Sequence, residues 1–338
     1  MSRIPVFVGL DYHQASVQVC VLNAQGRQLL NRDCPNDWKA IRRIVQRCGE
    51  PRRVAIEACN GAAHLADELI AHARWRVRLA HPGYVARLKQ SPDKSDHDDA
   101  RLLADLERVG YLPPVWLAPE AVRELRRVVR YRQQLIGERR NIKLRVSALL
   151  REQRLFLRGK AWTKVWRRCV VSLEELSEQA RWIVQRQVSR VEQLEEEIAT
   201  VEQRLAQMTR DDAVVAKLLE QKGVGPITAV TIRAEIGRFG RFRTGKQLAR
   251  FCGLSPRNAS SGTRQADAGL IKAGNPQLRV VLVEAAHRLL RFDERWSALG
   301  HELLEKGKPN CVVIAAIANR WVRGLHHQLA LRPPATAA

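Results

Sequence analysis

The sequence has no long apolar run. No stretch approaches the ~18 uninterrupted apolar residues of a membrane span. The first ten residues also lack the basic region and apolar core of a secretion signal. These two absences predict a soluble, intracellular protein without a membrane partner.

Paired cysteines are absent as well. Seven cysteines are scattered along the chain, no two form Cys-x-x-Cys, and no histidine spacing completes a zinc site. This pattern disfavours structural zinc and a disulfide framework, and it indicates free thiols in a reducing compartment.

Positive charge is what the sequence has in excess. Fifty-eight Lys and Arg stand against 35 Asp and Glu, a net charge of +23, and most of the cations are Arg. The guanidinium fork matches phosphate oxygens and stacks on bases. A GC-rich genome accounts for Arg over Lys but not for the net excess. The charge therefore predicts a polyanionic partner, most simply nucleic acid.

The 338 residues suggest two or three domains. In the first, apolar residues alternate over 6–10 and 17–21, which predicts strands. Further strands and helices are expected in the order βββ-α-β-α-β, a mixed α/β layer fold. The predicted strands are 27–33, 53–58 and 75–80, and the predicted helices are 38–48, 62–73 and 84–109, the last with a polar break at 91–95. Prolines near residue 115 end this domain, 1–115.

Two long helices are predicted for a middle domain, 116–210. Residues 120–160 hold 13 Lys and Arg against 4 Glu, and we assign phosphate contacts there to Arg126 and Arg130. The second helix, 173–208, carries apolar residues at alternating spacings of 3 and 4, a heptad seam. We predict an antiparallel coiled-coil arm; an ordinary helical bundle is the alternative.

Short helices separated by glycine are predicted for the third domain, 211–332, before a tail, 333–338. Gly223-Val224-Gly225-Pro226 resembles the turn of a helix-hairpin-helix. Amides at the start of the following helix bind phosphate without reading bases. A plain interhelical turn is the alternative.

Four carboxylates of the first domain need an explanation in so basic a chain. Asp11 follows one strand, Glu57 ends another, and Asp96 and Asp99 lie three residues apart at a helix start. If the first and fourth strands are neighbours, these side chains share one cleft. Hard oxygen ligands suit Mg²⁺ or Mn²⁺, and two such ions about 4 Å apart commonly serve phosphodiester displacement.

Blander explanations exist for these acids. Asp96 and Asp99 are also consistent with a helix cap, with Asp98 as a competitor, and Glu57 with an Arg pair. Sugar-kinase and actin-like ATPases also begin with a strand and Gly-x-Asp, but they need glycines after the Asp and a second glycine-rich loop. Neither is found here.

A basic loop further on contains Ser260-Ser261-Gly262. It is either a turn or a source of a hydroxyl nucleophile, which needs activation by a base or a metal. No histidine lies nearby in the sequence, so activation would have to come from metals of the first domain.

Together these segments resemble the DEDD transposases of the IS110 family, with its IS1111 branch and the related pilin-gene DNA invertases. The resemblance covers nearly the whole chain. Its acidic motifs are Gly9-Leu10-Asp11, Ile56-Glu57-Ala58 and Ser95-Asp96-x-x-Asp99; its C-terminal motifs are Gly223-Val224-Gly225-Pro226, Phe251-x-Gly253-Leu254-x-Pro256, Ser261-Gly262 and Lys272-Ala273-Gly274-Asn275-Pro276-x-Leu278-Arg279.

The resemblance implies a RuvC-like, RNase H-type N-terminal domain, a coiled-coil arm and a helical transposase domain. It implies that Asp11, Glu57, Asp96 and Asp99 bind Mg²⁺ or Mn²⁺, and that Ser261 forms a covalent phosphoserine link to a cut strand. Ser260 and Asp98 remain alternatives for Ser261 and for one of the aspartates. Gly223, Gly225, Lys272, Asn275 and Arg279 are expected to contact nucleic acid.

The resemblance also implies the partners: double-stranded donor and target DNA, a structured bridge RNA that pairs with both, and further copies of the chain, as dimers that form a tetramer. It implies a prokaryotic cytoplasmic enzyme, bound to the nucleoid when acting. Two alternatives remain: a metal-dependent RuvC-like nuclease or junction resolvase that uses water as the nucleophile, and a non-catalytic nucleic-acid-binding protein.

Overall fold

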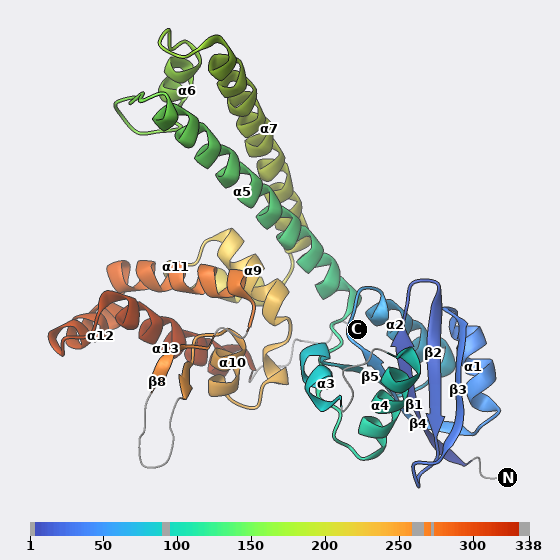
Figure 1. Cartoon of the computed structure of the whole chain (residues 1–338). Coiled ribbons are helices and arrows are strands. Elements are labelled where there is room, and N and C mark those ends of the chain that lie inside the picture. Colours follow the sequence, from blue (N-terminus) through green and yellow to red (C-terminus); the bar gives the residue numbers. More distant parts are fainter. Residues whose placement is uncertain (1–3, 90–94, 259–266, 272–273, 331–338) are drawn as a thin grey trace. The chain divides into compact units, whose positions relative to one another are not determined.

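The computed structural model describes residues 4–89, 95–258, 267–271 and 274–330 (Figure 1). The chain forms two compact units, residues 1–118 and 119–338. No helix in the described ranges combines the length and apolar character needed to cross a membrane.

The N-terminal unit is a six-stranded sheet in the order β3-β2-β1-β4-β5-β6. Strands β1 and β4 pair in parallel, as do β4 and β5, while the other pairs are antiparallel. The predicted neighbourhood of the first and fourth strands is confirmed. The elements are β1 (Pro5–Tyr12), β2 (Ser16–Leu22), β3 (Gln28–Pro35), α1 (Trp38–Gln46), β4 (Glu50–Glu57), α2 (Ala62–Ala73), β5 (Val77–Ala80), α3 (Pro82–Leu88), α4 (Asp96–Arg108) and β6 (Pro114–Val115).

Alternation along β1 divides its side chains between two helical layers. Val6, Val8 and Leu10 pack with α1 and α2 in one core cluster. The opposite face lies under α4, and a Cβ on Gly9 would stand 2.0 Å from the carbonyl oxygen of Ala100. Glycine at position 9 thus lets α4 lie directly on β1.

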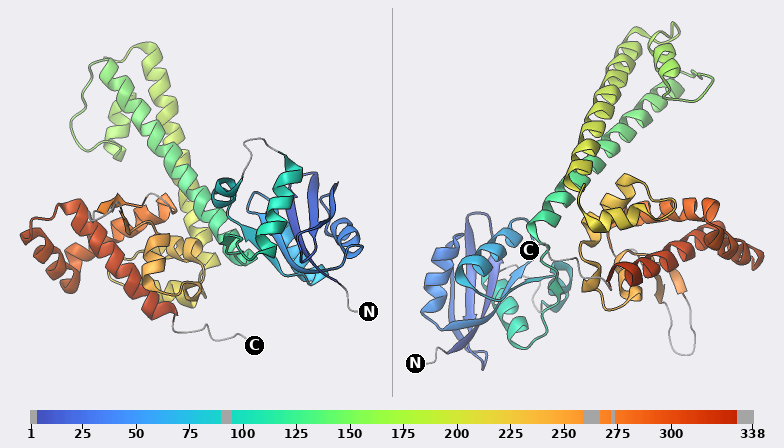
Figure 2. Two further views of the ribbon diagram at one scale, coloured as in Figure 1. Left: turned by 60° about the horizontal axis from the view of Figure 1, so that its bottom comes forward. Right: turned by 180° about the vertical axis from the view of Figure 1, so that it is seen from behind.

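The second unit begins with two long helices, α5 (Glu120–Glu152) and α7 (Glu178–Met208), joined through α6 (Lys164–Val171). They lie side by side in Figure 1 and in both views of Figure 2. The predicted seam faces inward, because Val191, Leu194 and Ile198 are buried with Leu135 and Ile142 of α5. The two helices form a hairpin; coiled-coil geometry in it stays a prediction.

The remaining elements of the second unit are mostly short helices. These are α8 (Ala213–Leu219), α9 (Pro226–Ile236), a 3-10 turn (Phe239–Arg241), α10 (Gly245–Phe251), the strands β7 (Pro256–Asn258) and β8 (Asp267–Leu270), α11 (Pro276–Phe292), α12 (Glu294–Glu305) and α13 (Asn310–Ala330). The sequence pattern gave no sign of the β7–β8 pair.

The hairpin and the C-terminal helices share a core, unlike the predicted division at residue 210. Leu125 and Val129 near the start of α5, and Leu205 near the end of α7, belong to the same buried cluster as Ile232 of α9 and Leu282 of α11. The mixed α/β unit with a helical second unit is consistent with a RuvC-like domain followed by a helical C-terminus.

Candidate active site

Strand register brings the first two predicted acids to the same edge of the sheet. Leu10 of β1 pairs with Ile56 of β4, and Asp11 and Glu57 are the next residues. Asp11 has the same parity as Gly9, and Glu57 that of Ala55, which packs under α4 with Leu103. Both carboxylates therefore belong to the face covered by α4.

The start of α4 supplies the other two acids. The Ser95 hydroxyl caps this helix by accepting from the amide of Asp98. Asp96 and Asp99 are three residues apart and so share a face of the helix. The side chain of Asp98 is 74% exposed, whereas that of Asp99 is 14% exposed. The geometry thus groups Asp99 with the sheet acids and leaves Asp98 in solvent.

Two cationic or basic groups stand among these carboxylates. The Nε2 atom of His13 lies 3.3 Å from Oδ2 of Asp11 and 3.2 Å from Oδ2 of Asp96. The ammonium of Lys89, just after α3, donates to Asp99 at 2.6 and 2.7 Å from its two oxygens. Sequence reasoning missed both residues as members of the site; the only signal was the position of His13, two residues after Asp11.

Electrostatics show that the acids crowd one another. Burial raises the pKa of Asp11, with Asp96 and Asp99 adding to the rise and His13 opposing it. Burial also raises the pKa of Glu57, where Lys89 opposes and Asp11 and Asp99 add. The hydrogen bond to Asp99 raises the pKa of Lys89. Carboxylates held together against their ionisation need a cation, and such clusters are typical of functional sites.

The donor set fits a divalent metal ion. Ligand atoms of Asp11, His13 and Asp96 all lie within 4.8 Å of one another, close enough to share one ion. Carboxylate oxygens suit Mg²⁺ or Mn²⁺. A metal bound here would neutralise the repulsion and place a Lewis acid beside the strand ends.

Predicted contacts in the second unit fall at helix starts. Gly223, with a φ of +77°, lies in the turn between α8 and α9, and Gly225 is the N-cap of α9. The Asn275 side chain caps α11 by accepting from two of its amides, and Arg279 reaches the carbonyl of Ile271 at 3.5 Å. Lys272, Ser260 and Ser261 lie outside the described residues.

The two arginines assigned to phosphate are engaged within the protein. Arg126 donates to the carbonyls of Ala234 and Glu235 at the end of α9, at 2.6 and 3.1 Å. Arg130 forms two 3.0 Å bonds with the carboxylate of Glu235, which is 4% exposed. This geometry favours a structural role, fastening α5 to α9, and differs from the predicted one.

Several α5 cations are neutralised by α7. Arg132 pairs with Glu202 at 2.6 Å, and Lys143 and Arg167 both reach Glu195. By contrast, Arg140 and Arg145 are exposed on α5, and no ion pair with a described residue is found for either. They are the better candidates for phosphate contact on this helix.

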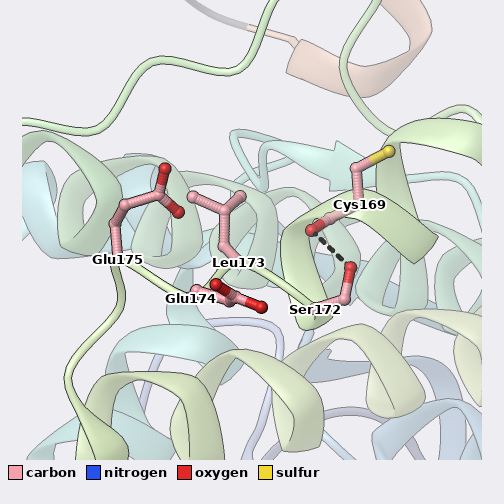
Figure 3. Close-up of a pocket in the computed structure, with 5 residues that line it drawn as sticks. All are labelled: Cys169, Ser172, Leu173, Glu174 and Glu175. Carbon is pink, nitrogen blue, oxygen red and sulfur yellow. Dashed lines mark hydrogen bonds between the residues drawn. The ribbon is translucent and has the colours of Figure 1, made fainter.

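A pocket of about 630 Å³ lies beside the loop after α6, lined by Cys169, Ser172, Leu173, Glu174 and Glu175 (Figure 3). Ser172 Oγ donates to the carbonyl of Cys169 at its edge. Two carboxylates in the lining repel phosphate, and no predicted site residue lies there. The pocket is therefore not a candidate for nucleic-acid chemistry.

Comparison with known families identifies both parts of the chain. A family model for DEDD transposases of the IS110 type, described as a transposase, matches residues 8–154. A second, described as the transposase IS116/IS110/IS902 family, matches residues 215–301. The first match includes all four acids, and the second includes Ser261.

Individual relatives agree over most of their length. A probable family 20 transposase of Pseudomonas aeruginosa is 32% identical, over 81% of this chain and 82% of the relative. The transposase for insertion sequence element IS1111A of Coxiella burnetii is 25% identical, over 84% and 78%. The transposase for IS1328 of Yersinia enterocolitica is 26% identical, over 94% of each chain.

Proposed function

The chain belongs to the IS116/IS110/IS902 family of transposases, and from this premise we propose that it is an RNA-guided DNA recombinase that cuts strands through a serine nucleophile. Family membership makes it a DNA-processing enzyme of an insertion sequence. The finer statements, namely the guide RNA, the covalent intermediate, the metal and the assembly, are our proposal.

One observation carries the proposal: four carboxylates with a fitting donor set gather at the β1 and β4 strand ends, in a chain of this family. Asp11, Glu57, Asp96 and Asp99 would hold Mg²⁺ or Mn²⁺. When bound, the ion supplies Lewis-acid stabilisation of the charge that develops on the phosphate. Lys89 holds Asp99 in place from the other side of the cluster.

In the proposed reaction, Ser261 Oγ forms a bond to the scissile phosphorus while the bond to the 3′ oxygen breaks. The serine proton passes to solvent, and the leaving oxygen takes up a proton. A 3′ hydroxyl of the exchanging strand later attacks the phosphoserine, which restores a phosphodiester and frees Ser261. Because the bond energy is conserved, strand exchange needs no ATP.

Recognition divides between RNA and protein. Pairing by a bridge RNA would choose the donor and target sequences, so the protein needs mainly phosphate contacts. The exposed Arg140 and Arg145, and the start of α9 at Gly225, offer such contacts. We further propose a dimer that forms a tetramer with composite sites, which mass measurement with and without nucleic acid will test; a persistent monomer on bound substrate contradicts it.

The test is strand cleavage with the element's RNA, nicked suicide DNA substrates and Mg²⁺, read on a denaturing gel. We expect a protein–DNA adduct with the wild type and with Ser260→Ala, and none with Ser261→Ala or Asp11→Ala. Cleavage without an adduct that survives Ser261→Ala and is lost in Asp11→Ala would instead establish a hydrolytic nuclease. Omitting the RNA, or changing its target loop, is expected to abolish or redirect cutting.

A further inference from the structure

His13 is aimed into the acid cluster from a fixed backbone. Its amide donates to the carbonyl of Ser16 at 2.9 Å, and its carbonyl accepts from the Asn36 side chain at 3.0 Å. These bonds close the turn between β1 and β2. The imidazole is therefore placed by the same hairpin that places Asp11, and it is not a free surface side chain.

The Nε2 atom itself is buried, although the ring is 40% exposed. It lies within 3.3 Å of one oxygen each of Asp11 and Asp96, yet it makes no hydrogen bond with any residue that the structure describes. A buried polar nitrogen without such a bond costs free energy. An imidazolium clamp would direct N–H bonds at the carboxylates; a ring nitrogen that shares an ion with them needs none.

The other half of the cluster already has a cation. The Lys89 ammonium contacts both oxygens of Asp99. A divalent ion would meet electrostatic repulsion on that side, whereas Asp11, His13 and Asp96 offer three ligand atoms within 4.8 Å of one another. Charge and distance thus favour the half without the lysine.

We propose that His13 is a metal ligand: the divalent ion binds between Asp11 and Asp96 and takes Nε2 of His13 as a nitrogen ligand. This inference rests on the proposed function in requiring a metal at the acid cluster. Imidazole binds Mn²⁺ better than it binds Mg²⁺, which prefers oxygen. The centre therefore favours Mn²⁺ more strongly than a purely carboxylate site does.

The test uses the full-length protein with Mn²⁺ alone. Pulsed electron paramagnetic resonance detects a ¹⁴N coupling when a nitrogen is bound to Mn²⁺. We expect this coupling in the wild type, its loss in His13→Gln, and its retention in His97→Gln, an exposed histidine on α4 that serves as the matched control. In addition, His13→Gln is expected to weaken Mn²⁺ binding by at least about tenfold, since even outer-sphere losses cost that much, and Mg²⁺ binding by less.

Bound Mn²⁺ without nitrogen coupling in the wild type, or with coupling that persists in His13→Gln, overturns the role of His13 and leaves the proposed function standing. Failure to bind Mn²⁺ at all contradicts both. Coupling in a protein that never cuts DNA supports the ligand and contradicts the proposed function. If His13→Gln does not fold, by circular dichroism, His13→Asn replaces it, and the wild-type signal already decides whether a nitrogen is bound.

Discussion

Glu57 in the N-terminal unit is surrounded by other acids, whereas Glu195 in the helical hairpin is surrounded by cations. Burial raises the pKa of Glu57, and Asp11 and Asp99 raise it further against the single opposing Lys89. Burial also opposes the ionisation of Glu195, but its bonds to Arg167 and Lys143 outweigh this and lower its pKa. One glutamate is a cost to the metal-free fold, and the other helps to hold α5 and α7 together.

The same contrast holds for the two units as wholes. Residues 1–118 contain 17 Lys and Arg against 13 Asp and Glu, while residues 119–338 contain 41 against 22. The helical unit uses its acids to pair cations and leaves other cations exposed. The N-terminal unit places acids beside acids, which makes sense only if a cation or a reaction needs them there.

The largest effect is expected from removing an acid of the cluster. Asp11→Asn should lower strand cleavage by about 10³-fold, because it removes a ligand and the charge that holds the metal. Asp98→Asn, an exposed neighbour on α4, should leave cleavage within about twofold. Cleavage rates at saturating Mg²⁺ measure both; equal losses would mean that general negative charge, and not the cluster, is what matters.

Two glycines sharpen the comparison through packing. Gly9→Ala forces a Cβ against the backbone of Ala100 and Ala104, so we expect about 1–3 kcal/mol of destabilisation and weaker metal binding. At Gly137 inside α5, a Cβ meets nothing within 4 Å, and Gly137→Ala should stabilise by about 0.8–1 kcal/mol. Denaturant unfolding of both variants checks the opposite signs.

Arginines on α5 divide into structural and exposed groups. Arg130→Ala leaves the buried carboxylate of Glu235 without its two bonds and should cost about 2 kcal/mol of unfolding free energy. Arg140→Ala with Arg145→Ala should leave stability unchanged but reduce the salt dependence of nucleic-acid binding, by about 0.9 in logarithmic slope per lost contact. A salt titration that shows no change in the double variant would remove these residues from the interface.

The smallest effect concerns the two glutamates in the metal-free protein at neutral pH. Glu57→Gln should raise the melting temperature, on the order of 2 °C, whereas Glu195→Gln should cost about 1 kcal/mol of stability. The folded-state pKa of Glu57 lies above its unfolded value, so its stabilising contribution is present at low pH and disappears as pH rises through the folded value. For Glu195 the contribution is present at higher pH and disappears as pH falls through its lowered folded value. Calorimetry across pH distinguishes the two.

Much of the N-terminal unit follows from local pattern. Alternation located the strands, and the parity of Asp11 and Glu57 is a consequence of strand geometry once β1 and β4 are neighbours. The i, i+3 spacing placed Asp96 and Asp99 on one face of α4. These relations depend on neighbours in sequence or on one strand pairing, which is why the acid cluster could be predicted.

What could not be predicted depends on tertiary contacts. Lys89 follows a short helix and His13 lies in a turn, so neither belongs to a periodic pattern that points at the acids. Arg126 and Arg140 have the same composition signal, and only packing against α9 separates them. The predicted domain boundary at 210 missed the core that α5 and α7 share with the C-terminal helices.

Mapping the DNA-linked residue tests the central claim most directly. Trypsin cuts after Arg257 and Arg264, so residues 258–264 form one peptide that contains both serines of the loop. After a metal-containing reaction on a suicide substrate and nuclease digestion, we predict this peptide with a nucleotide remnant on Ser261, absent when Asp11 is changed to Asn. Fully cut DNA with this peptide recovered unmodified would contradict the account.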